Sequence, residues 1–175
     1  PGRDWIFIGV IALLVVPLQM ALIPMFTLYN KVSLYDTVAG IVLFHVAFGL
    51  PFAIFLLRNF FIGIPKDIME SARIDGASEL VIFVRLILPL GLPAIASLAI
   101  FQFLWTWNDL LVALVFGASD LSPLTVSLAN LAGTQGTQWQ LLSAGAFLSI
   151  ALPLVVFLSL QRFFVRGLLA GGLKG

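Results

Sequence analysis

Four long apolar stretches alternate with polar segments along the chain. They occupy residues 6–26, 38–57, 94–116 and 141–164. A helix rises about 1.5 Å per residue, so about twenty residues are enough to cross a hydrocarbon core roughly 30 Å thick. The pattern therefore predicts four transmembrane helices in an all-α integral membrane protein, with residues 1–175 forming a single domain.

Proline and glycine modify this pattern inside the apolar stretches. Pro17 and Pro24 are expected to kink or break the first stretch, and the carbonyls that they free must face protein or water rather than lipid. Small residues allow helices to approach closely; the candidates are Gly40, Gly49 and Gly63. His45 is interpreted as a hydrogen-bonded residue of the helix packing.

The most polar part of the chain, residues 65–79, lies between the second and third stretches. It contains half of the eight carboxylates of the protein: Asp67, Glu70, Asp75 and Glu79. A hydrophobic chain that gathers its acids in this way is presenting the segment to water or to a soluble partner. We therefore expect residues 65–79 to lie outside the membrane.

Turn and capping signals divide this segment into two helices. Pro65 is expected at the first helical position, where its missing N–H is not needed. Gly76 follows an aspartate and predicts a sharp turn, because glycine tolerates a positive φ. Ser78 is expected to cap a second helix, residues 79–88, which Pro89 interrupts.

Composition supports a membrane protein and gives no sign of an enzyme. The chain is 61% hydrophobic and 10% charged, against roughly 45–50% and about 25% in soluble domains. A net charge of +1 without a cationic cluster does not indicate nucleic-acid binding, and without cysteine there is no thiolate metal site. The sequence contains no nucleophile–base pair, metal-ligand cluster or phosphate-binding loop. We predict neither metal nor cofactor, and expect any energy source to be a partner.

The distribution of Lys and Arg predicts the orientation in the membrane. If residues 65–79 are cytoplasmic, eight of the nine cations share their side: Arg3, Arg58, Lys66, Arg73, Arg85, Arg162, Arg166 and Lys174. Lys31 alone is opposite. Both ends of the chain are then cytoplasmic. Residues 117–140 are external, with Asp120 as their one acid and a core, residues 123–131, that is too short to span.

The pair Asn108-Asp109 is expected near the middle of the third stretch. An acid at the centre of a spanning helix costs about 2.5–3.5 kcal/mol on insertion scales, so it should face protein or water. The pair is therefore a candidate for the translocation path or for hydrogen bonding between helices. Alternatively, Trp105 and Trp107 mark an interfacial belt, and Asp109 lies closer to the outer surface.

Three motifs carry a resemblance to a known family. Glu70-Ser71-Ala72, three residues, Gly76, nine residues and then Leu86-Ile87-Leu88-Pro89 resemble the EAA loop of ABC importer permeases, here residues 65–89. The departures from the family pattern, Ser71 and Leu86, are mild. The segments 105–109 and 161–175 resemble the MalG-like carbohydrate-uptake subgroup.

The resemblance implies a permease subunit of an ATP-driven, binding-protein-dependent importer, and its subgroup implies a sugar or oligosaccharide as the solute. Its expected partners are a cytosolic ABC ATPase dimer, a second permease subunit and an extracytoplasmic solute-binding protein. The expected location is the cell membrane of a bacterium or archaeon. The residues implied in ATPase coupling are Ile68, Met69, Glu70, Ser71, Ala72, Asp75, Gly76 and Pro89, with Arg166 and Lys174 as tail contacts.

The resemblance also implies about two further spans before residue 1, so an N-terminally incomplete chain is expected. The alternative function is an ion-gradient-driven secondary transporter or a channel, for which His45 and Asp109 are the only candidates for a proton relay. A membrane scaffold without transport activity is a third possibility. The sequence does not identify the solute.

Overall fold

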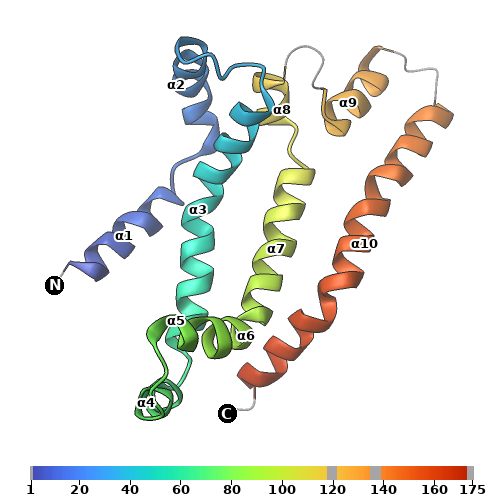
Figure 1. Ribbon diagram of the computed structural model, residues 1–175. Coiled ribbons are helices and arrows are strands. Elements are labelled where there is room, and N and C mark those ends of the chain that lie inside the picture. Colours follow the sequence, from blue (N-terminus) through green and yellow to red (C-terminus); the bar gives the residue numbers. More distant parts are fainter. Residues whose placement is uncertain (1, 118–121, 135–138, 173–175) are drawn as a thin grey trace.

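The computed structural model describes residues 2–117, 122–134 and 139–172, which form helices joined by turns and short loops, with no strand among them. Figure 1 shows the helices in their order along the chain. They are α1 (Arg3–Leu13), α2 (Leu18–Lys31), α3 (Val38–Ile62), α4 (Lys66–Ile74), α5 (Glu79–Ile82), the π-helix η1 (Phe83–Ile87), α6 (Leu88–Leu90), α7 (Leu92–Trp107), α8 (Leu111–Phe116), α9 (Leu124–Thr134) and α10 (Trp139–Gly172).

Two of these helices, α3 and α10, are each long and apolar enough to cross a membrane. Two bent pairs bring the number to four if each pair is one span: α1 with α2, and α5–α6 with α7. The predicted stretches 38–57 and 141–164 lie inside α3 and α10. The prediction of an all-α integral membrane protein is confirmed.

The first predicted span, residues 6–26, is broken rather than kinked. Helix α1 ends at Leu13, α2 begins at Leu18, and the two meet at 93°. Pro17 explains the break, because it has no N–H to continue the helix and it disfavours the helical conformation of the preceding residue. Pro24, by contrast, lies inside α2.

The third predicted span, residues 94–116, is also not one helix. Helix α7 ends at Trp107 and α8 begins at Leu111. The Asp109 carboxylate accepts hydrogen bonds from the backbone N–H groups of Val112 (3.3 Å) and Ala113 (3.0 Å). An aspartate that binds the first N–H groups of a helix favours a new helix start over continuation.

The helices place two polar regions at opposite ends of the molecule. In Figure 1, α4, α5 and α6 lie at one end, while the α2–α3 turn, α8 and α9 lie at the other. Helices α3, α7 and α10 run between the ends, and α7 contacts both α3 and α10.

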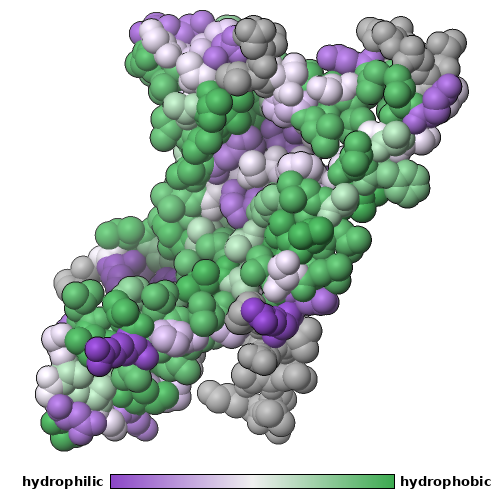
Figure 2. All heavy atoms as spheres, turned by 45° about the vertical axis from the view of Figure 1, so that its right-hand side comes forward, coloured by the Kyte–Doolittle hydropathy of each residue, from purple (hydrophilic) through white to green (hydrophobic). Residues whose placement is uncertain are grey.

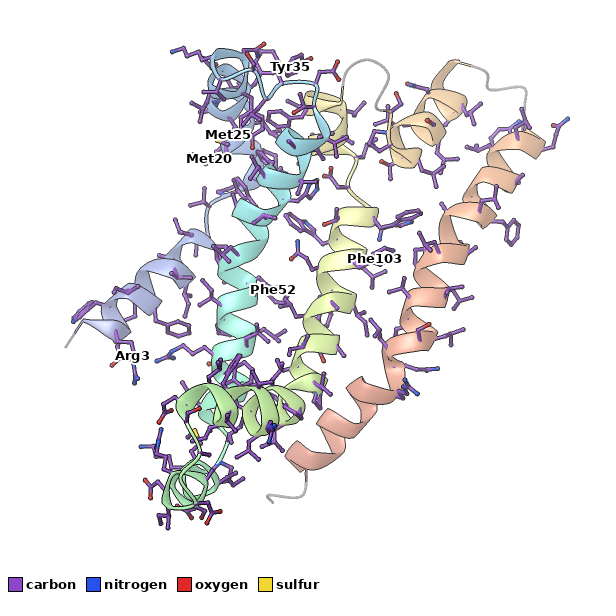
Figure 3. All side chains as sticks on the ribbon, viewed as in Figure 1. Arg3, Met20, Met25, Tyr35, Phe52 and Phe103 are labelled. Atoms are coloured by element: carbon purple, nitrogen blue, oxygen red, sulfur yellow. The ribbon has the colours of Figure 1, made fainter. Side chains whose placement is uncertain are left out.

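The buried core lies at the α8 end. It joins α2, α3 and α8 through Leu22, Tyr29, Phe44, Val112 and Phe116. The Phe116 ring lies 5.1 Å from each of the Tyr29 and Phe44 rings. Figure 3 shows Met25 and Tyr35, which pack against this core, at the same end, with Phe52 farther along α3.

Away from this core, apolar side chains cover the outside of the molecule. Figure 2 shows hydrophobic surface over most of its length, with hydrophilic side chains gathered toward the ends. Phe147 on α10 is 78% exposed, and Ile23 on α2 equally so. Surface of this kind needs lipid or a partner protein to cover it.

Candidate functional site

Helix α4 stands between two long helical segments and starts at a proline. Pro65 has φ −58° and ψ 132°, which is an extended conformation, and it precedes the first helical residue, Lys66. The predicted position of Pro65 inside the first turn is therefore wrong by one residue. Asp67 lies in the first turn, where a carboxylate interacts favourably with the positive end of the helix dipole.

The end of α4 is fixed by Gly76, which has φ +81°. The N–H of Ala77 donates to the carbonyl of Ala72 (3.0 Å), and the N–H of Gly76 donates to that of Arg73 (3.0 Å). These two bonds form a Schellman motif, which requires a left-handed residue at this position. A Cβ on Gly76 would meet nothing within 4 Å. The backbone angle, as the sequence predicted, is therefore the reason for glycine.

An ion pair holds α4 and α5 together across the turn. Arg73 donates from Nε to Oε1 of Glu79 (2.7 Å) and from Nη2 to Oε2 (3.2 Å). The hydrogen bond from Arg73 holds the pKa of Glu79 below its usual value. The contact is therefore complete above the ordinary carboxylate pKa and is lost only as the pH falls through the lowered one. Ser78 precedes α5 as predicted but makes no capping bond with its side chain.

The residues of α4 divide into an exposed and a covered side. Asp67, Glu70, Ser71 and Ile74 are exposed, and their spacing puts them on one side of the helix. We call these four residues the α4 face. Met69 and Ala72 are half-buried against the rest of the chain, and Ile68 is 37% exposed. The apolar residues proposed for docking thus do not share one face.

The helix after the turn differs from the prediction. Pro89 does not end it, because the π-helix η1 comes first and α6 continues through Pro89 to Leu90. A wider π turn avoids the clash between a proline ring and the carbonyl four residues earlier. The chain bends by 64° between α6 and α7, at Gly91. Both proposed tail contacts lie outside what the structure describes: Lys174 entirely, and Arg166 by its side chain. Asp120 also lies outside the described residues.

A second polar cluster lies where α7 ends. Besides binding the N–H groups of α8, Asp109 approaches His45 of α3, with 3.6 Å between Oδ2 and Nε2. The Asp109 carbonyl accepts a hydrogen bond from Thr125 of α9 (2.7 Å). Asp109 thus links α3, α8 and α9, and its place at a helix end corrects the expectation of a mid-helix acid. Asn108 is exposed, and among the described residues its side chain donates only to Leu104 of its own helix (2.8 Å).

His45 is a packing residue, but it is only half satisfied. Its Nδ1 lies 2.9 Å from the Ile41 carbonyl, whereas its buried Nε2 makes no hydrogen bond to any described group. The ring lies 5.3 Å from the Trp105 ring. Trp107 donates to the Ser149 carbonyl of α10 (2.9 Å). Both tryptophans therefore contact neighbouring helices.

The sequence reasoning missed two polar residues of α7, Gln102 and Thr106. They line a pocket of about 370 Å³ together with His45 and Gly49 of α3. Predicted close approach at Gly49 is confirmed, since a Cβ there would lie 2.5 Å from the Gln102 amide. A Cβ at Gly40 would likewise meet the Leu34 carbonyl. Among the described residues, a Cβ at Gly63 would meet only the Phe60 carbonyl of the same helical turn. Two uncharged polar residues four positions apart in an apolar helix were the available signal.

The described residues contain no group of three His, Asp or Glu side chains arranged to hold a metal ion. The α4 face offers two carboxylates, a hydroxyl and an isoleucine to a partner. The pocket beside Gln102 offers uncharged donors and acceptors between aliphatic walls.

Comparison with known proteins gives a family match over nearly the whole chain. Residues 1–169 match the family described as binding-protein-dependent transport system inner membrane component. The chain is 56% identical to the osmoprotective compounds uptake permease protein GgtD of Synechocystis sp., over 99% of this chain and 59% of that one. It is 57% identical to the alpha-glucoside transport system permease protein AglG of Rhizobium meliloti, over 100% and 48%.

A more distant relative, the trehalose transport system permease protein SugB of Mycobacterium tuberculosis, is 34% identical over 100% of this chain and 65% of that protein. The chain thus spans about half to two thirds of the length of these relatives.

Proposed function

Because the chain belongs to the family of binding-protein-dependent transport system inner membrane components, we propose that it is the membrane-spanning subunit of an ATP-driven importer. One observation carries the proposal: an exposed polar helix, α4, is held between two long helical segments by Gly76 and the Arg73–Glu79 pair. A rigid projection of this kind suits the transmission of force. The sequence of α4 and of its turn also resembles the EAA pattern, with Ser71 as a departure in this part.

The partner of α4 is a cytosolic ATPase dimer, and the α4 face is its contact surface. Closure of the ATPase dimer moves α4, and the fixed turn passes that movement to α5, η1 and α6, and on to α7. The half-buried Met69 and Ala72 hold α4 against its own chain, while Glu70 and Ile74 meet the ATPase. The family description supports this assembly, to which a second permease subunit and a solute-binding protein also belong.

The transported solute is a sugar or a sugar-like osmolyte. The names of the relatives support this class, since they concern alpha-glucosides, trehalose and osmoprotective compounds. The uncharged polar groups of the α3–α7 pocket are consistent with it. Uptake into proteoliposomes that contain the whole transporter tests the proposal, and we expect it to require ATP.

The alternative, transport driven by an ion gradient, has one feature in its favour: His45 and Asp109 lie 3.6 Å apart at the end of α7. However, both Asp109 oxygens accept backbone N–H groups of α8. The main role of such a carboxylate is to cap the helix, and protonation of the carboxylate would weaken the cap. The family membership favours the ATP-driven importer.

We propose that α4 faces the cytoplasm. Among the described residues, Arg58 lies in the last part of α3 and Arg162 in the second half of α10, and Figure 1 shows both helices running toward the α4 end there, whereas Lys31 ends α2, which lies at the opposite end. Arg58 also donates to Asp4 of α1 (3.1 Å), so the start of the chain belongs to the α4 end. The excess of cations there follows the positive-inside rule.

The orientation predicts opposite labelling of two exposed serines, Ser78 beside α4 and Ser122 before α9. In this cysteine-free chain, Ser122→Cys should react with an impermeant thiol reagent added to intact cells. Ser78→Cys should react only after the cells are opened. Labelling of both serine variants in intact cells would contradict the orientation.

A further inference from the structure

The groove between α3 and α7 has mostly apolar walls, which carry three polar residues: His45, Gln102 and Thr106. Gln102 and Thr106 are four residues apart on α7, and His45 and Gly49 are four residues apart on α3. Such pairs lie on one side of their helix, and the two pairs face each other across a pocket of about 370 Å³. This volume is within the range of small-molecule sites.

The polar groups of this groove have unused hydrogen-bonding capacity. The His45 Nε2 is buried and makes no hydrogen bond to any described group, although the Asp109 Oδ2 lies 3.6 Å from it. Among the described residues, none forms a hydrogen bond with the Gln102 amide or with the Thr106 hydroxyl. In an apolar medium an unpaired polar group costs several kcal/mol. At these three residues the groove is therefore better suited to water, a ligand or a partner helix than to lipid.

The lining indicates what kind of ligand fits. The described residues around the pocket include no Lys, Arg, Asp or Glu, and the remaining walls are aliphatic: Ile41, Val42, Val46, Leu50, Ala53 and Leu98. An ionic ligand would need an opposite charge here. A neutral, hydroxyl-rich molecule needs uncharged donors and acceptors for its hydroxyls and apolar walls for its C–H faces.

Gly49 brings the two helices close enough for this arrangement. A Cβ at Gly49 would lie 2.5–2.8 Å from three atoms of the Gln102 amide, so any larger residue would push Gln102 away. A second pocket, of about 330 Å³, lies on the other side of this contact and is lined by Gln102, Phe52 and Trp105 among others. Gln102 therefore stands between this mostly aliphatic groove and an aromatic one.

We propose that Gln102, Thr106 and His45 contact the neutral polyhydroxylated solute during its passage, with Gln102 as the specificity-determining residue. This inference rests on the proposed function and assigns part of the solute path to this chain. Asp109 is not part of the contact, because its oxygens are engaged with α8. Helix α10 lies on another side of α7 and leaves the groove open.

Cysteine accessibility tests whether the groove is a hydrated path. Single cysteines are placed at Gln102, Thr106 and Leu104 in a transporter whose partner subunits lack reactive cysteine. Leu104 is the matched control, because two residues along a helix place it nearly opposite Gln102. With a small water-soluble methanethiosulfonate, Gln102→Cys and Thr106→Cys should react at least tenfold faster than Leu104→Cys. Equal slow reaction of all three in resting and ATP-turnover states would mean that a partner helix fills the groove, and would overturn the proposal.

Uptake of trehalose, maltose and arabinotriose tests whether the solute is contacted. With sub-saturating loaded binding protein, Gln102→Leu should lower uptake about tenfold, as expected for a lost hydrogen bond of about 1.4 kcal/mol. Gln102→Asn, which keeps the amide, should recover much of it. Ser97→Ala is the control, because Ser97 bonds only the Pro93 carbonyl of its own helix (2.8 Å), and it should transport normally.

The two failures can be told apart in the same preparation. If the wild-type transporter shows no ATP-dependent uptake, the proposed function is wrong. If it does, and Gln102→Leu transports all three sugars at the wild-type rate, the importer stands and the contact with Gln102 is refuted. If Gln102→Leu instead abolishes ATP hydrolysis stimulated by the binding protein, Gln102 acts in assembly rather than in solute contact, which also overturns the inference.

Discussion

Gly76→Val is expected to lower binding-protein-stimulated ATP hydrolysis by the assembled transporter at least tenfold, while membrane insertion stays normal. Gly76 has φ +81°, a region that costs an L-residue about 1–2 kcal/mol and a β-branched one more. The Schellman bonds of Ala77 and Gly76 depend on this angle. Without them α4 loses its fixed direction relative to α5, and the α4 face no longer meets the ATPase. Hydrolysis with and without loaded binding protein measures the loss.

Matched variants separate the backbone angle from other effects. Gly76→Asn should keep most of the stimulation, because Asn tolerates the left-handed region. Gly9→Ala in α1 should be silent, since its Cβ also meets nothing within 4 Å and its φ is not positive. Glu70→Lys leaves the turn intact and reverses a charge on the α4 face, so it should lose stimulation like Gly76→Val. Full stimulated hydrolysis in both Gly76→Val and Glu70→Lys would remove α4 from the coupling path.

Asp109→Leu is expected to lower both thermal stability and uptake. Two backbone N–H groups of α8 lose their acceptor, and a hydrogen bond to a charged group contributes about 1.5–3 kcal/mol. For a chain of this size, roughly 2–4 °C of Tm correspond to each kcal/mol, so Tm should fall by about 4 °C or more. Helix α8 carries Val112 and Phe116 of the buried core, so its displacement should reduce uptake at least tenfold. Thermal unfolding of the purified transporter and uptake by proteoliposomes measure the two effects.

Asp109→Asn distinguishes the cap from a role of the charge. Its side-chain oxygen can still accept an N–H of α8, so the cap account predicts that Asp109→Asn recovers most of the lost Tm and uptake. A proton relay through His45 and Asp109 predicts that Asp109→Asn is as inactive as Asp109→Leu. If Asp109→Asn keeps the wild-type Tm but has no uptake, the charge is needed and the cap account of transport is wrong.

The parts of the fold that depend on local signals were predictable. The turn at Gly76 followed from one residue that tolerates a positive φ, and the predicted stretch 38–57 lies within α3 because its apolar run is unbroken. The family resemblance, carried by Glu70-Ser71-Ala72, Gly76 and the segment ending at Pro89, is confirmed by the family match. The role of the α4 face in coupling stays a prediction.

The parts that depend on competition between signals were not predictable. Pro17 separates two helices at 93°, yet Pro24, Pro51 and Pro153 lie inside helices, so proline alone does not locate a break. The helix breaks after Trp107 because the Asp109 carboxylate binds the backbone N–H groups of Val112 and Ala113. The sequence alone does not show whether this side-chain bonding or continued backbone bonding of the helix is preferred. The contact of Gln102 with Gly49 is tertiary, and no spacing in the sequence pairs these two residues.

The most direct measurement of the central claim is the energy source of uptake. Proteoliposomes are prepared with the complete transporter, with ATP trapped on the α4 side and sugar-loaded binding protein on the α9 side. The account predicts sugar uptake that stops without ATP and persists when ionophores dissipate proton and sodium gradients. Uptake that continues without ATP and stops with the ionophores would contradict it, because the chain would then be a secondary transporter.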